Sequence, residues 1–115
     1  MTSSNNPNDA TADLIARLYA TIESRRGADA SESYVSSLFQ KGTPAIARKV
    51  GEEAVEAVVA ALGEGRESLI AESADLLFHL MVLWADQEIR PADVFQELAR
   101  REGISGIEEK QGRKE

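Results

Sequence analysis

The stretch from Leu76 to Trp84 is apolar at every position except His79. Successive helical residues are rotated by about 100°, so side chains of such a run point to every side of the helix axis. A helix of this kind must be covered all round. The other short segments of a 115-residue chain can hardly supply that cover alone. We therefore expect this helix to pack against its own copy, in a bundle across the two-fold axis of a homodimer.

Helical patterns account for most of the chain. Apolar side chains recur at three-to-four spacing, which is typical of helices with one buried stripe. No segment alternates with period two over a useful length. The sequence therefore predicts an all-α fold, with helices at 10–26, 32–41, 43–62 and 66–88 and from 91 through 98.

Capping residues predict the ends of these helices. Ser31 is expected to cap the short second helix, and Gly42 to end it in a left-handed conformation. Thr43 is expected to cap the next helix, because the following Pro44 suits the first helical position. The break at 63–65 is short, so the long helices on either side are expected to form a central antiparallel hairpin.

Composition excludes several classes of protein. The net charge of -7, from 20 acidic and 13 basic residues, argues against nucleic acid or an anionic membrane as the main partner. The chain has no Cys, which excludes disulfides and thiolate metal sites. No apolar signal region or membrane-length apolar run is found, so we expect a soluble, cytoplasmic protein. One domain is expected at 9–107, between a disordered tail at 1–8 and a charged tail at 108–115.

Two pairs of carboxylates lie on the two helices of the expected hairpin. Glu53 and Glu56 are spaced i,i+3, as are Glu72 and Asp75. This spacing puts the two side chains of a pair about 60° apart around a helix. Their neighbours are apolar, and carboxylates among core-forming residues repel one another unless a cation lies between them. Hard cations take oxygen ligands, so the pattern predicts a Mg²⁺ site.

Such a site suits phosphoanhydride chemistry. Mg²⁺ in proteins commonly shares its coordination with phosphate oxygens and water, and it lowers the pKa of a bound water. Glu52 lies about 40° from Glu56 around the helix, so it is near enough to accept a proton from that water or to orient a ligand. Lys49 lies about 60° from Glu52, and Lys41 lies where the short helix ends. Both can offer positive charge to a phosphate.

The acidic pattern resembles that of the MazG-like all-α nucleoside triphosphate pyrophosphohydrolases. It consists of Glu52-Glu53-x-x-Glu56 followed, after fifteen residues, by Glu72-x-x-Asp75. The closer resemblance, over about 14–110, is to the phosphoribosyl-ATP pyrophosphatases of histidine biosynthesis. It is carried by the segments at 33–42 (SYVSSLFQKG), 49–56 (KVGEEAVE), 74–80 (ADLLFHL) and 103–110 (GISGIEEK).

The resemblance implies Mg²⁺-dependent hydrolysis of the α-β phosphoanhydride of phosphoribosyl-ATP, to phosphoribosyl-AMP and pyrophosphate, by a homodimer. Carried over by position, it implies three groups of site residues. The metal ligands would be Glu53, Glu56, Glu72 and Asp75; the accessory base or ligand-orienting group would be Glu52; and the contacts to phosphate or ribose would be Ser33, Tyr34, Lys41, Arg48 and Lys49. One departure is Val35, where the family often has Thr.

Two alternatives stay open at this point. A house-cleaning MazG-like pyrophosphohydrolase for ordinary or damaged nucleoside triphosphates would use the same metal and anhydride chemistry. A non-catalytic helical dimerisation module would explain the apolar helix but not the acidic residues beside it. Two residues also have simpler interpretations: His79 is expected to be a hydrogen-bonded core residue, and Lys49 can pair with glutamates on its own helix.

Overall fold

The computed structural model describes residues 7–104, and these are helical with no strand. The prediction of an all-α fold is confirmed. The α-helices are α1 (Pro7–Ser24), α2 (Tyr34–Lys41), α3 (Thr43–Val59), α4 (Arg66–Asp86) and α5 (Pro91–Arg100), with a 3-10 turn η1 (Ala30–Glu32) and a π-helical turn η2 (Ala60–Glu64). The expected tails lie outside the described residues, except that α1 already includes Pro7 and Asn8.

Two capping predictions are wrong. Ser33, not Ser31, caps α2, because its Oγ accepts a hydrogen bond from the Ser36 backbone N–H at 2.9 Å. Ser31 instead lies in η1, where its backbone N–H donates to Asp29 at 3.0 Å. Several Ser and Asp residues compete as caps in this segment, and the extra 3-10 turn moves the start of α2 beyond Ser31.

The second capping error concerns the start of α3. Gly42 is its N-cap, with a φ of 94° that suits glycine, and Thr43 is already helical. The Thr43 hydroxyl donates to Asp86 Oδ2 at 2.6 Å, so it ties the start of α3 to the end of α4. At its other end α3 stops at Val59, and the chain turns through η2 to Gly65.

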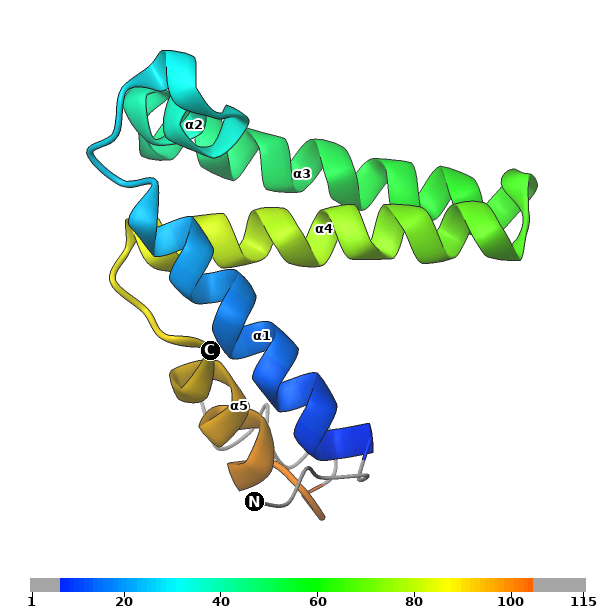
Figure 1. Cartoon of the computed structure of the whole chain (residues 1–115). Coiled ribbons are helices and arrows are strands. Elements are labelled where there is room, and N and C mark those ends of the chain that lie inside the picture. The colour runs from blue at the N-terminus through cyan, green and yellow to red at the C-terminus, as the bar shows by residue number, and fades with distance from the viewer. Residues whose placement is uncertain (1–6, 105–115) are drawn as a thin grey trace, which may run out of the picture.

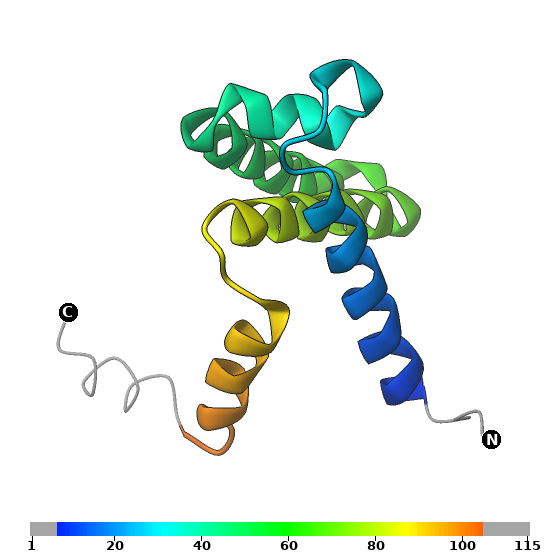
Figure 2. The same ribbon diagram turned by 60° about the vertical axis from the view of Figure 1, so that its left-hand side comes forward.

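Helices α3 and α4 lie side by side along most of their length, with η2 joining them at one end (Figure 1). Helix α2 packs against α3 near the opposite end, where α1 also contacts α4. Figure 2 shows α1 and α5 extending away from the α3–α4 pair on the same side. One arm of the molecule is therefore made by α3, η2 and α4 alone.

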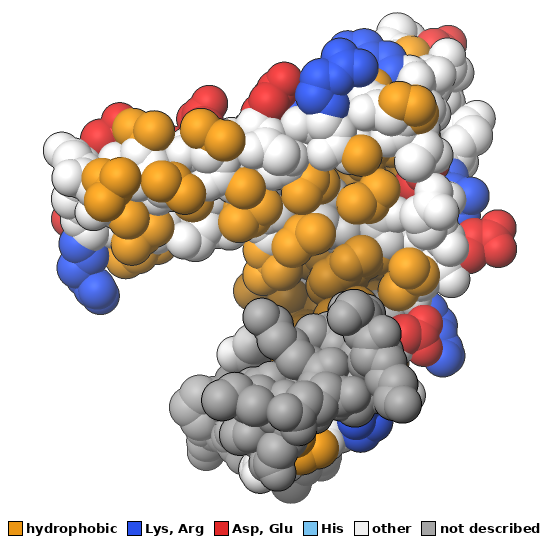
Figure 3. Space-filling view, turned by 180° about the vertical axis from the view of Figure 1, so that it is seen from behind, with side chains coloured by type: hydrophobic (Ala, Val, Ile, Leu, Met, Phe, Trp, Pro, Cys, Tyr) orange, Lys and Arg blue, Asp and Glu red, His pale blue; other side chains and the backbone are white. Residues whose placement is uncertain are grey.

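The core lies where α1, α2, α3 and the second half of α4 meet. Its buried apolar residues are Ile22, Leu38, Ile46, Met81, Val82 and Ala85. The far half of the α3–α4 arm is covered much less. Large apolar side chains there are exposed, namely Val55, Val58, Val59, Leu62, Leu69, Ile70 and Leu77. Figure 3 shows hydrophobic side chains continuing along one face of this arm. Within the described chain, the apolar helix is not covered all round.

Helix α4 is the one described helix whose length and apolar content would allow it to cross a membrane. It nevertheless carries Glu72, Asp75 and His79, and it packs along α3. The core helix of a soluble protein has the same length and composition. Packing against α3 and the core covers only part of it, since 22% of this apolar stretch is buried in the described chain.

A hydrogen bond from Tyr19 links α1 to the segment between α4 and α5. The Tyr19 hydroxyl donates to the Ile89 carbonyl oxygen at 2.6 Å. Burial, followed by the hydrogen bond and charge of Glu23, raises the Tyr19 pKa from 10.0 to about 12. Because the folded pKa is the higher one, this contribution to stability is fully present below pH 10 and is lost as the pH rises through about 12.

We therefore expect Tyr19→Phe to lower the melting temperature at neutral pH. The difference between wild type and variant should narrow between pH 10 and 12. Thermal unfolding followed by circular dichroism at a series of pH values measures this. A difference that is constant up to pH 12 would show that the hydroxyl does not titrate as described.

Candidate active site

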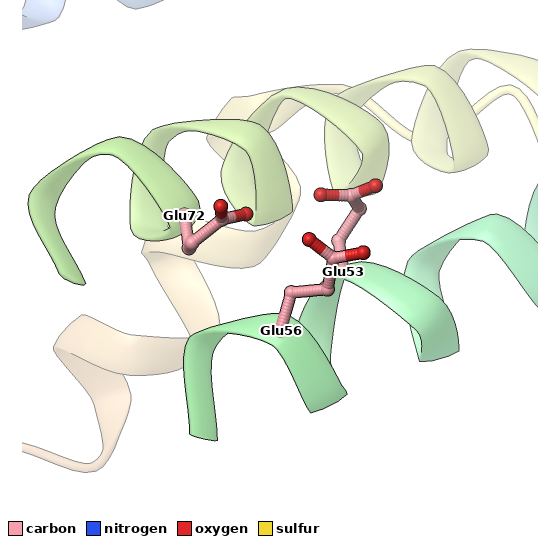
Figure 4. A group of neighbouring side chains, drawn as sticks. All are labelled: Glu53, Glu56 and Glu72. Atoms are coloured by element: carbon pink, nitrogen blue, oxygen red, sulfur yellow. The ribbon is translucent and has the colours of Figure 1, made fainter. Parts of the chain in front are cut away.

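Three glutamates from two helices meet between α3 and α4. Glu53 and Glu56 lie one turn apart on α3, and Glu72 faces them from α4. One carboxylate oxygen from each lies within 4.8 Å of the others. Figure 4 shows the three side chains directed into the space between the two helices. Three oxygens at this separation can ligate one divalent cation.

The burial of this cluster also favours a cation. The Glu53 side chain is buried, and Glu72 Oε1 is a buried atom with no hydrogen-bond partner in the described structure. A buried carboxylate oxygen without a donor is costly. Burial raises the Glu72 pKa, and the charges of Glu56, Asp75 and Glu53 raise it further. A divalent cation would neutralise this charge and supply the missing partner, so the residues present fit Mg²⁺.

Asp75 is not part of this cluster. Its side chain is exposed, one turn beyond Glu72 along α4. Its backbone carbonyl oxygen accepts a hydrogen bond from His79 Nδ1 at 2.7 Å. The structure thus brings together three of the four expected ligands, and the role of Asp75 as a ligand stays a prediction.

Lys49 lies beside the cluster, on the same helix as Glu53. Its Nζ atom is 3.3 Å from Glu53 Oε2 and 3.7 Å from Glu52 Oε1. The hydrogen bond to Glu53 is the main cause that raises the Lys49 pKa. The simpler interpretation of Lys49, as the partner of glutamates on its own helix, is therefore observed. The pairing also holds one cation next to the carboxylates.

A basic cavity of about 270 Å³ lies between α2 and α3. It brings together five of the expected site residues. Its lining consists of Tyr34, Lys41, Arg48, Lys49 and Glu52, with Leu38 and Ala45. Because Lys49 also contacts Glu53, this cavity adjoins the carboxylate cluster. A phosphate bound by these cations would lie near the three glutamates.

Ser33 is an expected substrate contact that does not line this cavity. Its Oγ accepts the Ser36 backbone N–H and donates to Ser36 Oγ, both at 2.9 Å. Ser36 Oγ in turn donates to the Arg25 carbonyl oxygen at 3.3 Å. The observed function of Ser33 is thus to start α2, which places Tyr34 at the first helical position.

A second cavity, of about 370 Å³, lies on the η2 side of the cluster. Glu56 and Glu72 line it, and so does Glu64 of η2, with Val55 and Val59. The charge of Glu64 also contributes to the raised pKa of Glu72. We did not expect Glu64 at the site. Its position between two glycines marked it as part of a turn, and no local pattern showed that the turn would bring it back to the cluster.

His79 is the hydrogen-bonded core residue that the sequence predicts. It is buried, with Nδ1 2.7 Å from the Asp75 carbonyl oxygen and Nε2 2.8 Å from the Tyr34 hydroxyl. The rings of Tyr34 and Phe78 meet its ring edge-on. The hydrogen bond joins α4 to the basic cavity, and nothing in the spacing of the two residues, 45 positions apart, indicated it.

The excess of negative charge predicts a measurable effect on stability. We expect Glu72→Gln to raise the melting temperature in the presence of a chelator, because it removes both a poorly solvated charge and its repulsion by Glu53 and Glu56. Thermal unfolding of wild type and variant measures this. Adding Mg²⁺ should stabilise wild type more than Glu72→Gln, whereas an equal response of both would contradict a cation site at Glu72.

Known proteins resemble the chain over most of its length. The sequence model of the family "Phosphoribosyl-ATP pyrophosphohydrolase" matches residues 15–102. A phosphoribosyl-ATP pyrophosphatase of Azospirillum brasilense is 55% identical over 104 residues, which cover 90% of this chain and 94% of that protein. Another, of Paramagnetospirillum magneticum, is 56% identical over 100 residues, covering 87% and 92%. A third, of Methylibium petroleiphilum, is 58% identical over 97 residues, covering 84% and 81%. The resemblance read from the acidic and flanking segments is confirmed: the chain belongs to the phosphoribosyl-ATP pyrophosphohydrolase family.

Proposed function

We propose that the chain hydrolyses the α-β phosphoanhydride of phosphoribosyl-ATP to phosphoribosyl-AMP and pyrophosphate, the second step of histidine biosynthesis, in the cytoplasm. The relatives described above are phosphoribosyl-ATP pyrophosphatases, which supports this substrate. The observation that carries the proposal is the cluster of Glu53, Glu56 and Glu72, with its unpartnered buried oxygen, beside a basic cavity. Hydrolysis of a phosphoanhydride needs carboxylates that bind a hard metal ion and basic side chains that bind phosphate, and this site offers both.

The carboxylates would hold the metal. Glu53, Glu56 and Glu72 offer oxygen ligands. We propose Asp75 as a fourth ligand, whose exposed side chain would change rotamer to reach the metal. Bound there, Mg²⁺ would stabilise charge on the phosphoryl oxygens and make a water more acidic. Lys49, held by Glu53, keeps a positive charge at the border between the cluster and the cavity.

Glu52 is the proposed base. It is exposed on α3, lines the basic cavity, and precedes the cluster residue Glu53 in the chain. A carboxylate in that position can accept the proton that the attacking water loses. Its Oε1 lies 3.7 Å from Lys49 Nζ, another residue of the cavity wall.

The cations of the cavity would bind the phosphates. Lys41 and Arg48 have exposed side chains at the cavity wall, and Lys49 completes the group. Lys and Arg side chains donate hydrogen bonds and accept none, which suits anionic oxygens. We also propose that Tyr34 contacts the substrate, and that Ser33 acts at least by placing Tyr34.

We further propose that α3 and α4 form the central hairpin of a bundle that a second copy of the chain completes. The exposed apolar side chains that follow one another along the α3–α4 arm support this, because large contiguous apolar patches are rare on soluble monomers. A symmetric dimer would cover the arm of each chain with that of its partner. Neither nucleic acid nor a membrane is expected as a partner of this acidic chain.

Ile70→Asp tests the dimer. Ile70 is 53% exposed on α4, so a charge there costs a single chain little but would be buried between two arms. We expect wild type to sediment at twice the 12.5 kDa of one chain and Ile70→Asp to shift toward 12.5 kDa, in analytical ultracentrifugation. Wild type that is monomeric at micromolar concentration would contradict the proposal.

The activity is tested by pyrophosphate release from phosphoribosyl-ATP and from a panel of nucleoside triphosphates, with Mg²⁺ and with a chelator. We expect Mg²⁺-dependent release with a strong preference for phosphoribosyl-ATP. Comparable rates on ordinary nucleoside triphosphates would favour a house-cleaning enzyme. No release from any substrate, with the fold intact, would favour a dimerisation module.

A further inference from the structure

Tyr34 connects the basic cavity with the core of the molecule. It is the first residue of α2, half of its side chain is exposed, and it lines the cavity with Lys41 and Arg48. Its hydroxyl lies 2.8 Å from Nε2 of the buried His79. One end of this hydrogen bond therefore faces the proposed substrate site, while the other belongs to α4.

The backbone determines which ring nitrogen of His79 carries the proton. Nδ1 lies 2.7 Å from the carbonyl oxygen of Asp75, which can only accept a hydrogen bond. Nδ1 must therefore be the N–H donor. In the neutral imidazole Nε2 is then an acceptor, so the Tyr34 hydroxyl donates its single proton to Nε2.

This arrangement determines what Tyr34 can offer to a ligand. With its proton directed to His79, the hydroxyl oxygen presents only lone pairs to the cavity. Phosphate oxygens are also acceptors, so they gain nothing from this oxygen. Burial is the main cause that raises the Tyr34 pKa; the positive charge of Lys49 offsets part of this, and the charges of Glu53, Glu52 and Asp75 add to it. The net direction is upward, so the hydroxyl stays protonated at neutral pH. The group that suits Tyr34 is a hydrogen-bond donor, whereas Lys41 and Arg48 suit phosphate.

We propose that the Tyr34 oxygen accepts a hydrogen bond from a donor group of the nucleoside part of the substrate, a ribose hydroxyl or a base N–H, and does not bind its phosphates, and that His79 is a positioning residue that keeps Tyr34 in this acceptor state. The inference rests on the proposed function and assigns one end of the substrate. Tyr34 recognises the nucleoside part, and the cations of the cavity recognise the phosphates.

Two measurements on matched variants separate these contacts: the KM for phosphoribosyl-ATP and the inhibition constant of inorganic pyrophosphate, both with Mg²⁺. We expect Tyr34→Phe to raise KM by about 3- to 10-fold, as the loss of one hydrogen bond does, and to leave pyrophosphate inhibition within about twofold of wild type. Arg48→Gln should raise both the KM for phosphoribosyl-ATP and the inhibition constant of pyrophosphate. Equal increases of KM and of the pyrophosphate constant in Tyr34→Phe would overturn the proposal.

Variants of His79 test the positioning role. His79→Leu removes the acceptor and should raise KM as much as Tyr34→Phe, with a smaller effect on kcat. His79→Gln should recover most of the loss, because its amide oxygen can accept the Tyr34 proton. The double variant Tyr34→Phe/His79→Leu should have the KM of Tyr34→Phe alone. A KM in folded His79→Leu equal to that of wild type would overturn the role of His79.

Failure of this inference differs from failure of the proposed function. Wild type that releases no pyrophosphate from phosphoribosyl-ATP would overturn both. Active wild type with the contrary pattern in the variants would overturn only the assignment of Tyr34 and His79. Circular dichroism checks folding. If His79→Leu does not fold, Tyr34→Phe decides the assignment of Tyr34, and a KM in His79→Gln as high as in Tyr34→Phe would overturn the role of His79, since Gln keeps the acceptor.

Discussion

Glu56→Gln is expected to lower the turnover of phosphoribosyl-ATP by more than about 100-fold, because even groups that only orient a metal ligand are worth roughly 10- to 100-fold. Glu56 offers one of the three oxygens that lie within 4.8 Å of one another. The amide keeps the shape of the side chain but loses the charge that binds a hard cation. Its exposed position means that the fold should survive, and circular dichroism can verify this.

The matched control for Glu56→Gln is Glu67→Gln. Glu67 is exposed in the first turn of α4, and it lines none of the cavities described. Removing the charge of Glu67 should leave the turnover of phosphoribosyl-ATP unchanged. Asp75→Asn is the informative third variant: we expect a loss similar to that of Glu56→Gln if Asp75 joins the cluster when Mg²⁺ binds. Near-normal rates in Glu56→Gln would undercut the assignment of the site.

Ile46→Ala is expected to lower the free energy of unfolding by about 2–5 kcal/mol. Ile46 has no exposed surface and packs in the core with Ile22, Met81 and Val82. Its loss leaves a cavity where α3 meets α4, and the surrounding helices can close it only in part. Small domains have only about 5–15 kcal/mol of stability in total, so the variant should be close to unfolding at 37 °C.

Urea denaturation at one fixed protein concentration measures this effect, because association would add to apparent stability. Ile46→Val is the graded control, with an expected loss of about 0.5–1.5 kcal/mol. A loss in Ile46→Ala no larger than that of the control would show that α3 and α4 do not pack at this position as described.

The helices were predictable from local patterns, and so were the starts of three of them, whereas the start of α2 was not. Proline and glycine signals placed α3, α4 and α5 closely, because Pro44, Gly65 and Pro91 restrict the backbone wherever they occur. The cap of α2 was misplaced from Ser33 to Ser31, since both residues can accept a backbone hydrogen bond. The 3-10 turn η1, which Asp29 caps, includes Ser31 and leaves Ser33 as the cap of α2.

The carboxylate cluster was predictable in part. Helical spacing put Glu53 and Glu56 on one side of α3, and the short connection to α4 brought Glu72 opposite them. Asp75 has the same spacing but stays exposed. Whether Glu72 or Asp75 faces α3 depends on the rotation of α4 about its own axis. The packing of the buried residues of α4 in the core sets this rotation, and no local sequence pattern specifies it.

The sequence by itself determined the all-α fold and the approximate positions of the helices, and it indicated the acidic residues of the candidate site, because helical periodicity, proline and glycine geometry and carboxylate spacing act over a few residues. Only the tertiary structure decided which side chains meet: the hydrogen bond between Tyr34 and His79, the position of Glu64 on the cavity beside the cluster and the separation of Asp75 from the cluster. These depend on how α2, η2 and α4 are oriented against one another, and that orientation is set by the packing of the whole core.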